Sequence, residues 1–189
     1  MLALFAVSCN TDDVENRPVV QGENAPVLEA PEEGNTYTLN PETLDQLAER
    51  FVWTAANFGE GIIPDYDIEI DFAGENFDTP AIIGTTNGVT QLAVSVNILN
   101  TALETLGATP FETATFQVRI KAYVGESVLH SNAVEMIITP FSTESPKLYL
   151  RGNFLSASGY GDGDWGDNTN PPYIEAEAFG STSFEGYVY

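Results

Sequence analysis

The fold is decided by residues 65–72, DYDIEIDF, in which acidic and large apolar side chains alternate at every position. Successive side chains of a β-strand point to opposite faces of its sheet, so this alternation predicts a strand with one apolar and one polar face. We expect the apolar face to lie in a core and the four carboxylates to face solvent. Because four carboxylates on one face repel one another, the pattern also predicts cations on a neighbouring strand.

The candidate neighbour is the segment of residues 115–124, TFQVRIKAYV. Its alternation places the apolar side chains inward and leaves Arg119 and Lys121 outward, and these are two of only six basic residues in the chain. We predict that the two strands are antiparallel neighbours, with Arg119 and Lys121 set against Asp67 and Glu69 as cross-strand pairs. Exposed pairs of this kind contribute only about 0–1 kcal/mol each, so they select register more than they stabilise the fold.

The segments before this pair predict a short helix and another strand. Asn40 precedes a proline, which is typical of a helix N-terminus, and Leu44 and Leu47 follow at helical spacing. Residues 51–54, FVWT, are β-branched and aromatic and predict a strand. Trp53 is expected to fill the core.

The remaining segments predict two more strands, a helical crossover and a closing strand. Residues 81–83 are apolar, and apolar side chains alternate along residues 92–98. Leucines at helical spacing over residues 99–106 predict a short helix that ends at Gly107. Residues 132–140 predict a last strand, which ends at a proline.

These segments predict an all-β fold. About seven short strands without a parallel βαβ pattern indicate an immunoglobulin or fibronectin-III type antiparallel sandwich with a short helical crossover, over residues 25–141. Residues 142–146 form a linker. The 43 residues 147–189 contain strand patterns at residues 147–152 and 183–189 but bury too little to fold alone, so we expect the truncated start of a second β domain.

The charge of the chain limits its partners. It has 28 acidic and 6 basic residues and a net charge of −22. Nucleic acid is therefore excluded as a partner, because its affinity for proteins comes from lysine and arginine. An anionic membrane surface also repels such a chain, so attachment to a membrane requires a covalent anchor.

The single cysteine, Cys9, lies between an apolar run and an acidic segment. Residues 1–9 have the pattern of the end of a signal peptide, and Ser8 is the small residue expected before a processing site. The stretch resembles the lipobox of bacterial lipoproteins, in which the cysteine is lipidated and becomes the first mature residue. The polar residues 10–24 then predict a flexible acidic tether. The alternative is an incidental cysteine near a terminus.

Taken together, these segments resemble the SusE family, the outer-membrane lipoproteins of Bacteroidetes glycan-utilisation systems. The resemblance implies an immunoglobulin-like spacer, one or more carbohydrate-binding modules, a glycan transporter complex as partner and no catalytic activity. Asp12 and Asp13 resemble the acidic signal that sends such lipoproteins to the cell surface, although they can equally be solvated tether residues. The segments that carry the family resemblance are FVWTAA (51–56), ALETLG (102–107), TFQVRIKAYV (115–124), SNAVEMIITPF (131–141) and LYLRGNF (148–154).

A polar loop at residues 159–173 contains the candidate sugar-binding residues. Sugar rings stack their apolar faces on aromatic rings, and their hydroxyl groups need donors and acceptors. The alternative is that the tryptophan of this loop covers the core of the second domain. The candidates are the aromatic residues Trp165, Tyr160 and Tyr173 and the polar residues Asp164, Asp167 and Asn168.

Metal binding and catalysis have weaker support in the sequence than sugar binding. Asp162, Asp164 and Asp167 are closely spaced, as in calcium loops, but the EF-hand spacing is absent, so we expect no metal site and no cofactor. His130, the only histidine, is expected to be an exposed strand residue because no oxyanion glycine motif accompanies it. We therefore expect no catalytic residues.

The expected function is that of a non-catalytic, surface-exposed lipoprotein of the outer membrane. Its partners are a polysaccharide or oligosaccharide, the membrane through the lipid anchor, and a glycan transporter complex. One alternative is a structural or adhesive sandwich that contacts protein and binds no sugar. Another is an accessory domain of a glycoside hydrolase.

Overall fold

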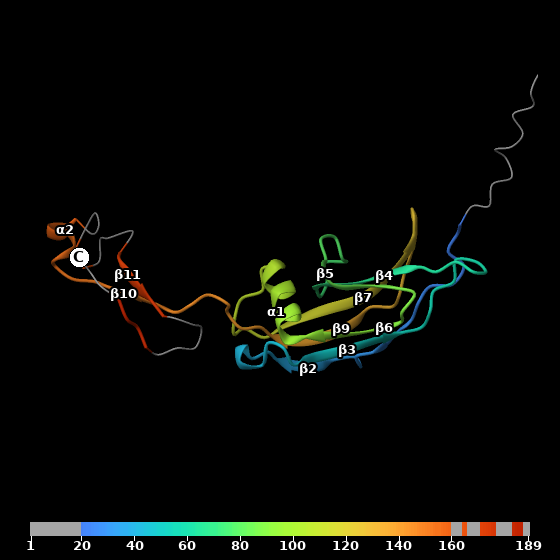
Figure 1. Cartoon of the computed structure of the whole chain (residues 1–189), viewed down its shortest axis with the longest axis horizontal. Helices are drawn as coiled ribbons and strands as arrows, with labels where there is room; N and C mark the ends of the chain where they lie inside the picture. The colour runs from blue at the N-terminus through green and yellow to red at the C-terminus, as the bar shows by residue number, and fades with distance from the viewer. Residues whose placement is uncertain (1–19, 160–163, 166–170, 177–182, 187–189) are drawn as a thin grey trace, which may run out of the picture.

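The computed structural model describes residues 20–159, 164–165, 171–176 and 183–186, and over these residues the protein is mostly β-structure (Figure 1). The predicted all-β fold is confirmed. The elements are β1 (Leu28–Ala30), β2 (Asn35–Thr38), the 3₁₀ helix η2 (Pro41–Thr43), β3 (Leu47–Trp53), β4 (Asp65–Phe72), β5 (Ala81–Asn87), β6 (Gln91–Ser95), α1 (Val96–Thr105), β7 (Ala114–Val124), β8 (Ser127–His130), β9 (Val134–Thr139), β10 (Lys147–Tyr149), α2 (Leu155–Ser158) and β11 (Tyr173–Glu175).

The strand predicted over residues 65–72 is β4, and it pairs antiparallel with β7. The register places Asp67 opposite Lys121 and Glu69 opposite Arg119, as predicted. The apolar side chains of β7 at alternate positions 116–122 are completely buried. The alternation in the two sequences therefore predicts the inward face, and the matched charges predict the pairing.

The expectation that the carboxylates of β4 face solvent is wrong. Asp67, Glu69 and Asp71 are only 3–6% exposed. Side chains from the neighbouring strands and the loop after β4 lie over them. The Phe77 ring lies 4.1 Å from Arg119 Cζ, and Thr85 Oγ1 donates a hydrogen bond to Asp67.

Two sheets form the sandwich. One has the strand order β1-β3-β6, and the other has the order β2-β9-β7-β4-β5, with β8 also paired to β7. An antiparallel sheet was expected, but the second sheet is mixed, because β2 runs parallel to β9. The chain crosses from the first sheet to the second between β1 and β2 and arrives in the direction of β9.

The core lies between these sheets. Trp53 of β3 and Tyr66 of β4 are buried and meet edge to face, with ring centroids 5.5 Å apart. Leu99 and Leu103 of α1 belong to the same apolar cluster and close one end of it. Trp53 is a core residue, as predicted, and each large side chain buried here contributes about 2 kcal/mol.

Two local predictions were wrong at their boundaries. The helix at Asn40 exists, with the Asn40 side chain accepting a hydrogen bond from the Glu42 backbone, but it is one 3₁₀ turn, and Leu47 already belongs to β3. The strand predicted to run to residue 98 ends at Ser95, whose hydroxyl caps α1. A short alternation of apolar residues also fits one face of a helix, so this pattern does not decide between a strand and a helix.

The entry and exit segments of the sandwich lie at opposite ends. Figure 1 shows residues 20–27 (blue) at one end, which we call the N-terminal pole, and residues 140–146 (orange) at the other, the exit pole. The bridge between Asn24 and Asn57 fixes the chain at the first pole. β7, with eleven residues, spans much of the distance between the poles and is roughly 35 Å long.

The C-terminal segment contains a two-stranded sheet of β10 and β11. β10 ends at Tyr149, three residues before the predicted end of that strand at Gly152. The second predicted strand is wrong where it is described, because residues 183–186 are not in a strand. Leu155 and Ala176 are buried in this segment, apart from the apolar cluster of the sandwich.

Candidate functional site

An exposed aromatic surface lies on one face of the β10–β11 sheet. The register places Tyr149 opposite Tyr173 and Lys147 opposite Glu175, so these four side chains share one face, which we call the tyrosine face. The two tyrosine rings have centroids 5.8 Å apart at an interplanar angle of 59°. Tyr149 is 53% exposed and Tyr173 is 48% exposed, so their rings are open to a ligand.

Backbone contacts fix this short sheet at both ends. The Ala176 amide donates to the Pro146 carbonyl, and the Leu150 amide donates to the Pro172 carbonyl, both at 2.8 Å. Each proline supplies only its carbonyl to the ladder, which suits the end of a strand. The tyrosine face is therefore held by the backbone on both sides of the ring pair.

A cation completes the tyrosine face. Lys147 Nζ lies 5.0 Å from the ring centroid of Tyr173. An ammonium at this distance is attracted to the electron-rich face of the ring. The face therefore presents two aromatic rings, three ammonium donors and the Glu175 carboxylate, which are the groups that recognise a sugar's apolar face and its hydroxyls.

Of the three predicted sugar-binding residues that the structure describes, Asp164, Trp165 and Tyr173, it brings only Tyr173 to this face. Its partner, Tyr149, was not among the predicted residues, although the alternation of Lys147 and Tyr149 was a signal that the two share a face. The pairing of Tyr149 with Tyr173 depends on the register of two segments more than twenty residues apart. Nothing local in the sequence specifies that register.

Trp165 lies in the turn near Arg151 and Gly152. Its amide donates to the Gly152 carbonyl at 3.4 Å, and its own carbonyl accepts from Arg151 Nη1 at 3.2 Å. The side chain is 64% exposed among the residues that the structure describes. Trp165 is thus an exposed ring on the same segment as the tyrosine face.

Asp164 has a structural contact. Its Oδ1 accepts hydrogen bonds from the backbone amide and the hydroxyl of Ser156, at 2.9 and 2.8 Å, in the first turn of α2. Tyr160, Asp162, Asp167 and Asn168 lie outside the described residues. In the part of the chain that the structure describes, no group of three or more His, Cys, Asp or Glu residues could hold a metal ion.

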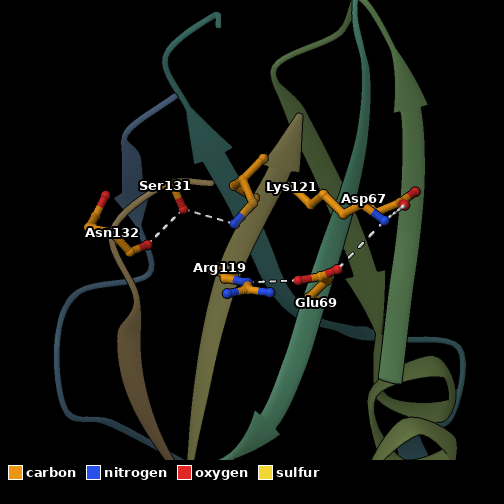
Figure 2. A network of polar contacts seen from close by, with 7 residues as sticks. Asp67, Glu69, Arg119, Lys121, Ser131 and Asn132 are labelled. Carbon is orange, nitrogen blue, oxygen red and sulfur yellow. Dashed lines mark hydrogen bonds and ion pairs between the residues drawn. The ribbon is translucent and has the colours of Figure 1, made fainter. Parts of the chain in front are cut away.

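The sandwich carries a second polar cluster, the ion-pair ladder of Asp67, Glu69, Arg119 and Lys121 (Figure 2). Arg119 Nε donates to Glu69 Oε2 at 2.7 Å. Lys121 Nζ lies 3.7 Å from Asp67 Oδ2 and 3.9 Å from Glu69 Oε1. Because the charges pair with one another across the two strands, the ladder has the character of a structural cluster.

His130 and Ser131 lie beside this ladder. His130 is exposed and lies opposite Lys121. Partial burial lowers the pKa of His130, and the nearby charges of Arg119 and Lys121 lower that pKa further. The Ser131 hydroxyl accepts from the Ile120 amide and donates to the Asn132 carbonyl (Figure 2), so it bridges backbone groups where β8 gives way to β9.

Two observations bear on attachment to a membrane. Cys9, the predicted lipidation site, lies outside the described residues. In the described part of the chain, no helix is long and apolar enough to span a bilayer, and the longest, α1, has 10 residues.

Comparison with known proteins identifies the family. No curated protein matches the chain. The family model described as SusE outer membrane protein matches residues 12–121, which include most of the sandwich. The match covers more than half of the chain and contains β4, β7 as far as Lys121, and so the ion-pair ladder. The chain therefore belongs to the SusE family of outer-membrane proteins, which serve glycan utilisation.

Proposed function

We propose that this protein is a non-catalytic lipoprotein at the cell surface that holds polysaccharide through its C-terminal segment. Acylation of Cys9 anchors the chain, and residues 10–24 are the tether. Residues 25–141 act as a spacer domain, residues 142–146 as a linker and residues 147–189 as a carbohydrate-binding module. The family match supports the outer-membrane and glycan-utilisation context of this proposal.

The observation that carries the sugar-binding role is the exposed ring pair of Tyr149 and Tyr173. Two neighbouring tyrosines that are each about half exposed are costly to leave in water, since large aromatic surfaces are normally buried. Flanked by Lys147 and Glu175, they offer stacking and hydrogen bonding together. This combination suits the alternating apolar faces and hydroxyls of a glycan chain.

The positions of the two poles support the spacer role. The chain enters the sandwich at the N-terminal pole and leaves it at the exit pole, so the β10–β11 sheet lies at the end away from residues 20–27 (Figure 1). A single aromatic site binds sugar weakly. Tethering many copies beside a glycan transporter complex raises the effective concentration of the sugar at the transporter.

Native affinity electrophoresis in gels that contain α- or β-glucans tests this proposal. The full chain with Cys9→Ser, which cannot be acylated, should be retarded by at least one glucan. Tyr173→Ala and Trp165→Ala should each reduce the retardation. Unchanged mobility of the unsubstituted protein in every glucan would overturn the proposal and favour a sandwich that contacts only protein.

A matched control is available in Tyr123 on β7. Lys121 Nζ lies 5.2 Å from the Tyr123 ring, nearly the distance that separates Lys147 from the Tyr173 ring. Tyr123→Ala therefore removes a similar tyrosine–lysine pair from the sandwich. It should leave the retardation unchanged.

A further inference from the structure

A groove separates the sandwich from the β10–β11 sheet. Its volume is about 500 Å³, within the range of small-molecule sites. Phe111, from the loop that precedes β7, lines it on the sandwich side. The linker contributes Ser142 and Glu144, and the tyrosine face contributes Lys147 and Tyr149.

The groove and the tyrosine face are continuous because they share residues. Tyr149 lines the groove and also lies 5.8 Å from the Tyr173 ring. Lys147 lines the groove and places its ammonium over Tyr173. A linear ligand that lies on the tyrosine face can therefore extend into the groove without leaving the surface.

The sandwich side of the groove is firmly held. The buried Asn100 of α1 binds the Phe141 backbone twice, by donating to its carbonyl at 3.1 Å and accepting from its amide at 2.9 Å. Glu104, one helical turn later, accepts hydrogen bonds from the amide and the hydroxyl of Thr143. The first residues after β9 are thus fixed to α1, and the groove is built on a rigid support.

Phe111 is placed in the groove at a conformational cost. Its backbone has φ +66°, in the left-handed region that bulky residues rarely adopt, and its side chain is 64% exposed. The Phe111 amide donates to the Pro140 carbonyl at 2.8 Å, which holds this conformation. The exposed ring therefore lines the groove in a conformation that the backbone holds in place.

We propose that this groove is a second sugar subsite, which rests on the proposed glycan binding and extends it. The subsite takes further units of a polysaccharide chain whose neighbouring units lie on Tyr149 and Tyr173. Phe111 provides a ring for stacking, and Ser142, Glu144 and Lys147 provide acceptors and donors for hydroxyls. The sandwich is then part of the binding surface as well as a spacer, and the bound glycan spans the two units.

Phe111→Gly is the sharpest test. Glycine suits φ +66° and keeps the backbone amide, so the variant removes the ring without adding strain. Glu144→Gln removes a charge from the groove, and Glu126→Gln, at an exposed carboxylate of the β7–β8 turn, is its matched control. Ile82→Ala, at an exposed apolar residue of β5, is the control for Phe111.

Binding of a disaccharide and of a hexasaccharide from the retarding glucan is measured by calorimetry on the full chain with Cys9→Ser. Phe111→Gly should weaken hexasaccharide binding by roughly fivefold, which is about 1 kcal/mol, and leave disaccharide binding nearly unchanged. Glu144→Gln should have a smaller effect in the same direction. The controls should bind as the unsubstituted protein does.

The outcomes separate this inference from the function on which it rests. If the unsubstituted protein binds neither sugar, both proposals are overturned. If it binds, and Tyr173→Ala weakens the binding while Phe111→Gly and Glu144→Gln bind the hexasaccharide normally, only the second subsite is overturned. Circular dichroism and melting of each variant confirm that a loss of binding does not come from a loss of fold.

Discussion

Glu69 and Arg119 are direct cross-strand neighbours, and Arg119 Nε lies 2.7 Å from Glu69 Oε2. The Glu69 side chain is only 7% exposed, and that of Arg119 is 21% exposed. The pair is thus more buried than the surface ion pairs that contribute little to stability. The ionised form of a carboxylate this buried depends on its cation for stabilisation, because little water reaches the carboxylate to take the place of the cation.

Removal of this cation should destabilise the sandwich. Arg119→Met keeps an aliphatic stem under Phe77 but leaves Lys121, at 3.9 Å, as the remaining ion-pair partner of Glu69 among the described residues. We expect a loss of about 2 kcal/mol in the free energy of unfolding, less than the ~3–5 kcal/mol of fully buried pairs, because water reaches Arg119. Urea denaturation at neutral pH measures it.

Two further variants test whether the loss comes from a buried charge without its partner. Arg50→Met, at an exposed cation of β3, should change the free energy of unfolding by less than about 0.5 kcal/mol. Combining Glu69→Leu with Arg119→Met should recover most of the loss, since no charge is then buried alone. A double variant as unstable as Arg119→Met would contradict this explanation.

Asn100 should contribute more to the stability of the fold than its position in a short helix suggests. Asn100→Ala removes both buried hydrogen bonds from Asn100 to the Phe141 backbone, which costs about 1–3 kcal/mol. Asn97→Ala, at an exposed asparagine of the same helix, is the control and should be nearly neutral. Equal melting temperatures for the two variants would show that the contact between α1 and the exit segment is not stabilising.

His130 should make stability depend on pH in a defined direction. Its pKa is lowered in the folded state, so below about pH 6.5, the unperturbed value, the unfolded chain binds more protons than the folded one. The contribution of neutral His130 to the stability of the fold is therefore complete above that pH and is lost as the pH falls. Relative to His130→Asn, the unsubstituted protein should lose stability between about pH 7.5 and pH 5. A constant difference over this range would argue against the shift.

The sequence predicted the β4–β7 pair correctly because two independent patterns agree there. The alternation of apolar residues selected the inward faces, and matching the two cations to the two central carboxylates gave the observed register. Burial of Asp67, Glu69 and Asp71 was not predictable in the same way. It depends on the loop after β4, which brings Phe77 over Arg119, and such contacts have no local signal.

The candidate site was predictable only in part. Tyr173 follows two prolines at the end of a polar stretch and is the first residue of β11, so its exposure could be proposed from sequence. Its pairing with Tyr149 requires the register of two three-residue strands, which contain too few residues to encode it by alternation. Phe111 carried no signal, since a phenylalanine in a loop is usually assigned to the core.

Acylation of Cys9 stays a prediction that cell experiments can check. Bacteria producing the protein should incorporate labelled palmitate into it, and Cys9→Ala should abolish the label and release the protein from the membrane fraction. The lost acyl chains contribute about 0.8 kcal/mol for each buried methylene, and the net charge of −22 offers no electrostatic substitute. An unlabelled protein that stays in the membrane fraction would mean that it is held by other contacts.

The central claim is that the tyrosine face binds polysaccharide, and calorimetric titration of the best-retarding glucan tests it most directly. Tyr149→Ala and Tyr173→Ala should each weaken binding by roughly fivefold or more, which is about 1 kcal/mol of lost stacking, while Tyr123→Ala binds normally. Equal affinity in all three variants and the unsubstituted protein would contradict the claim.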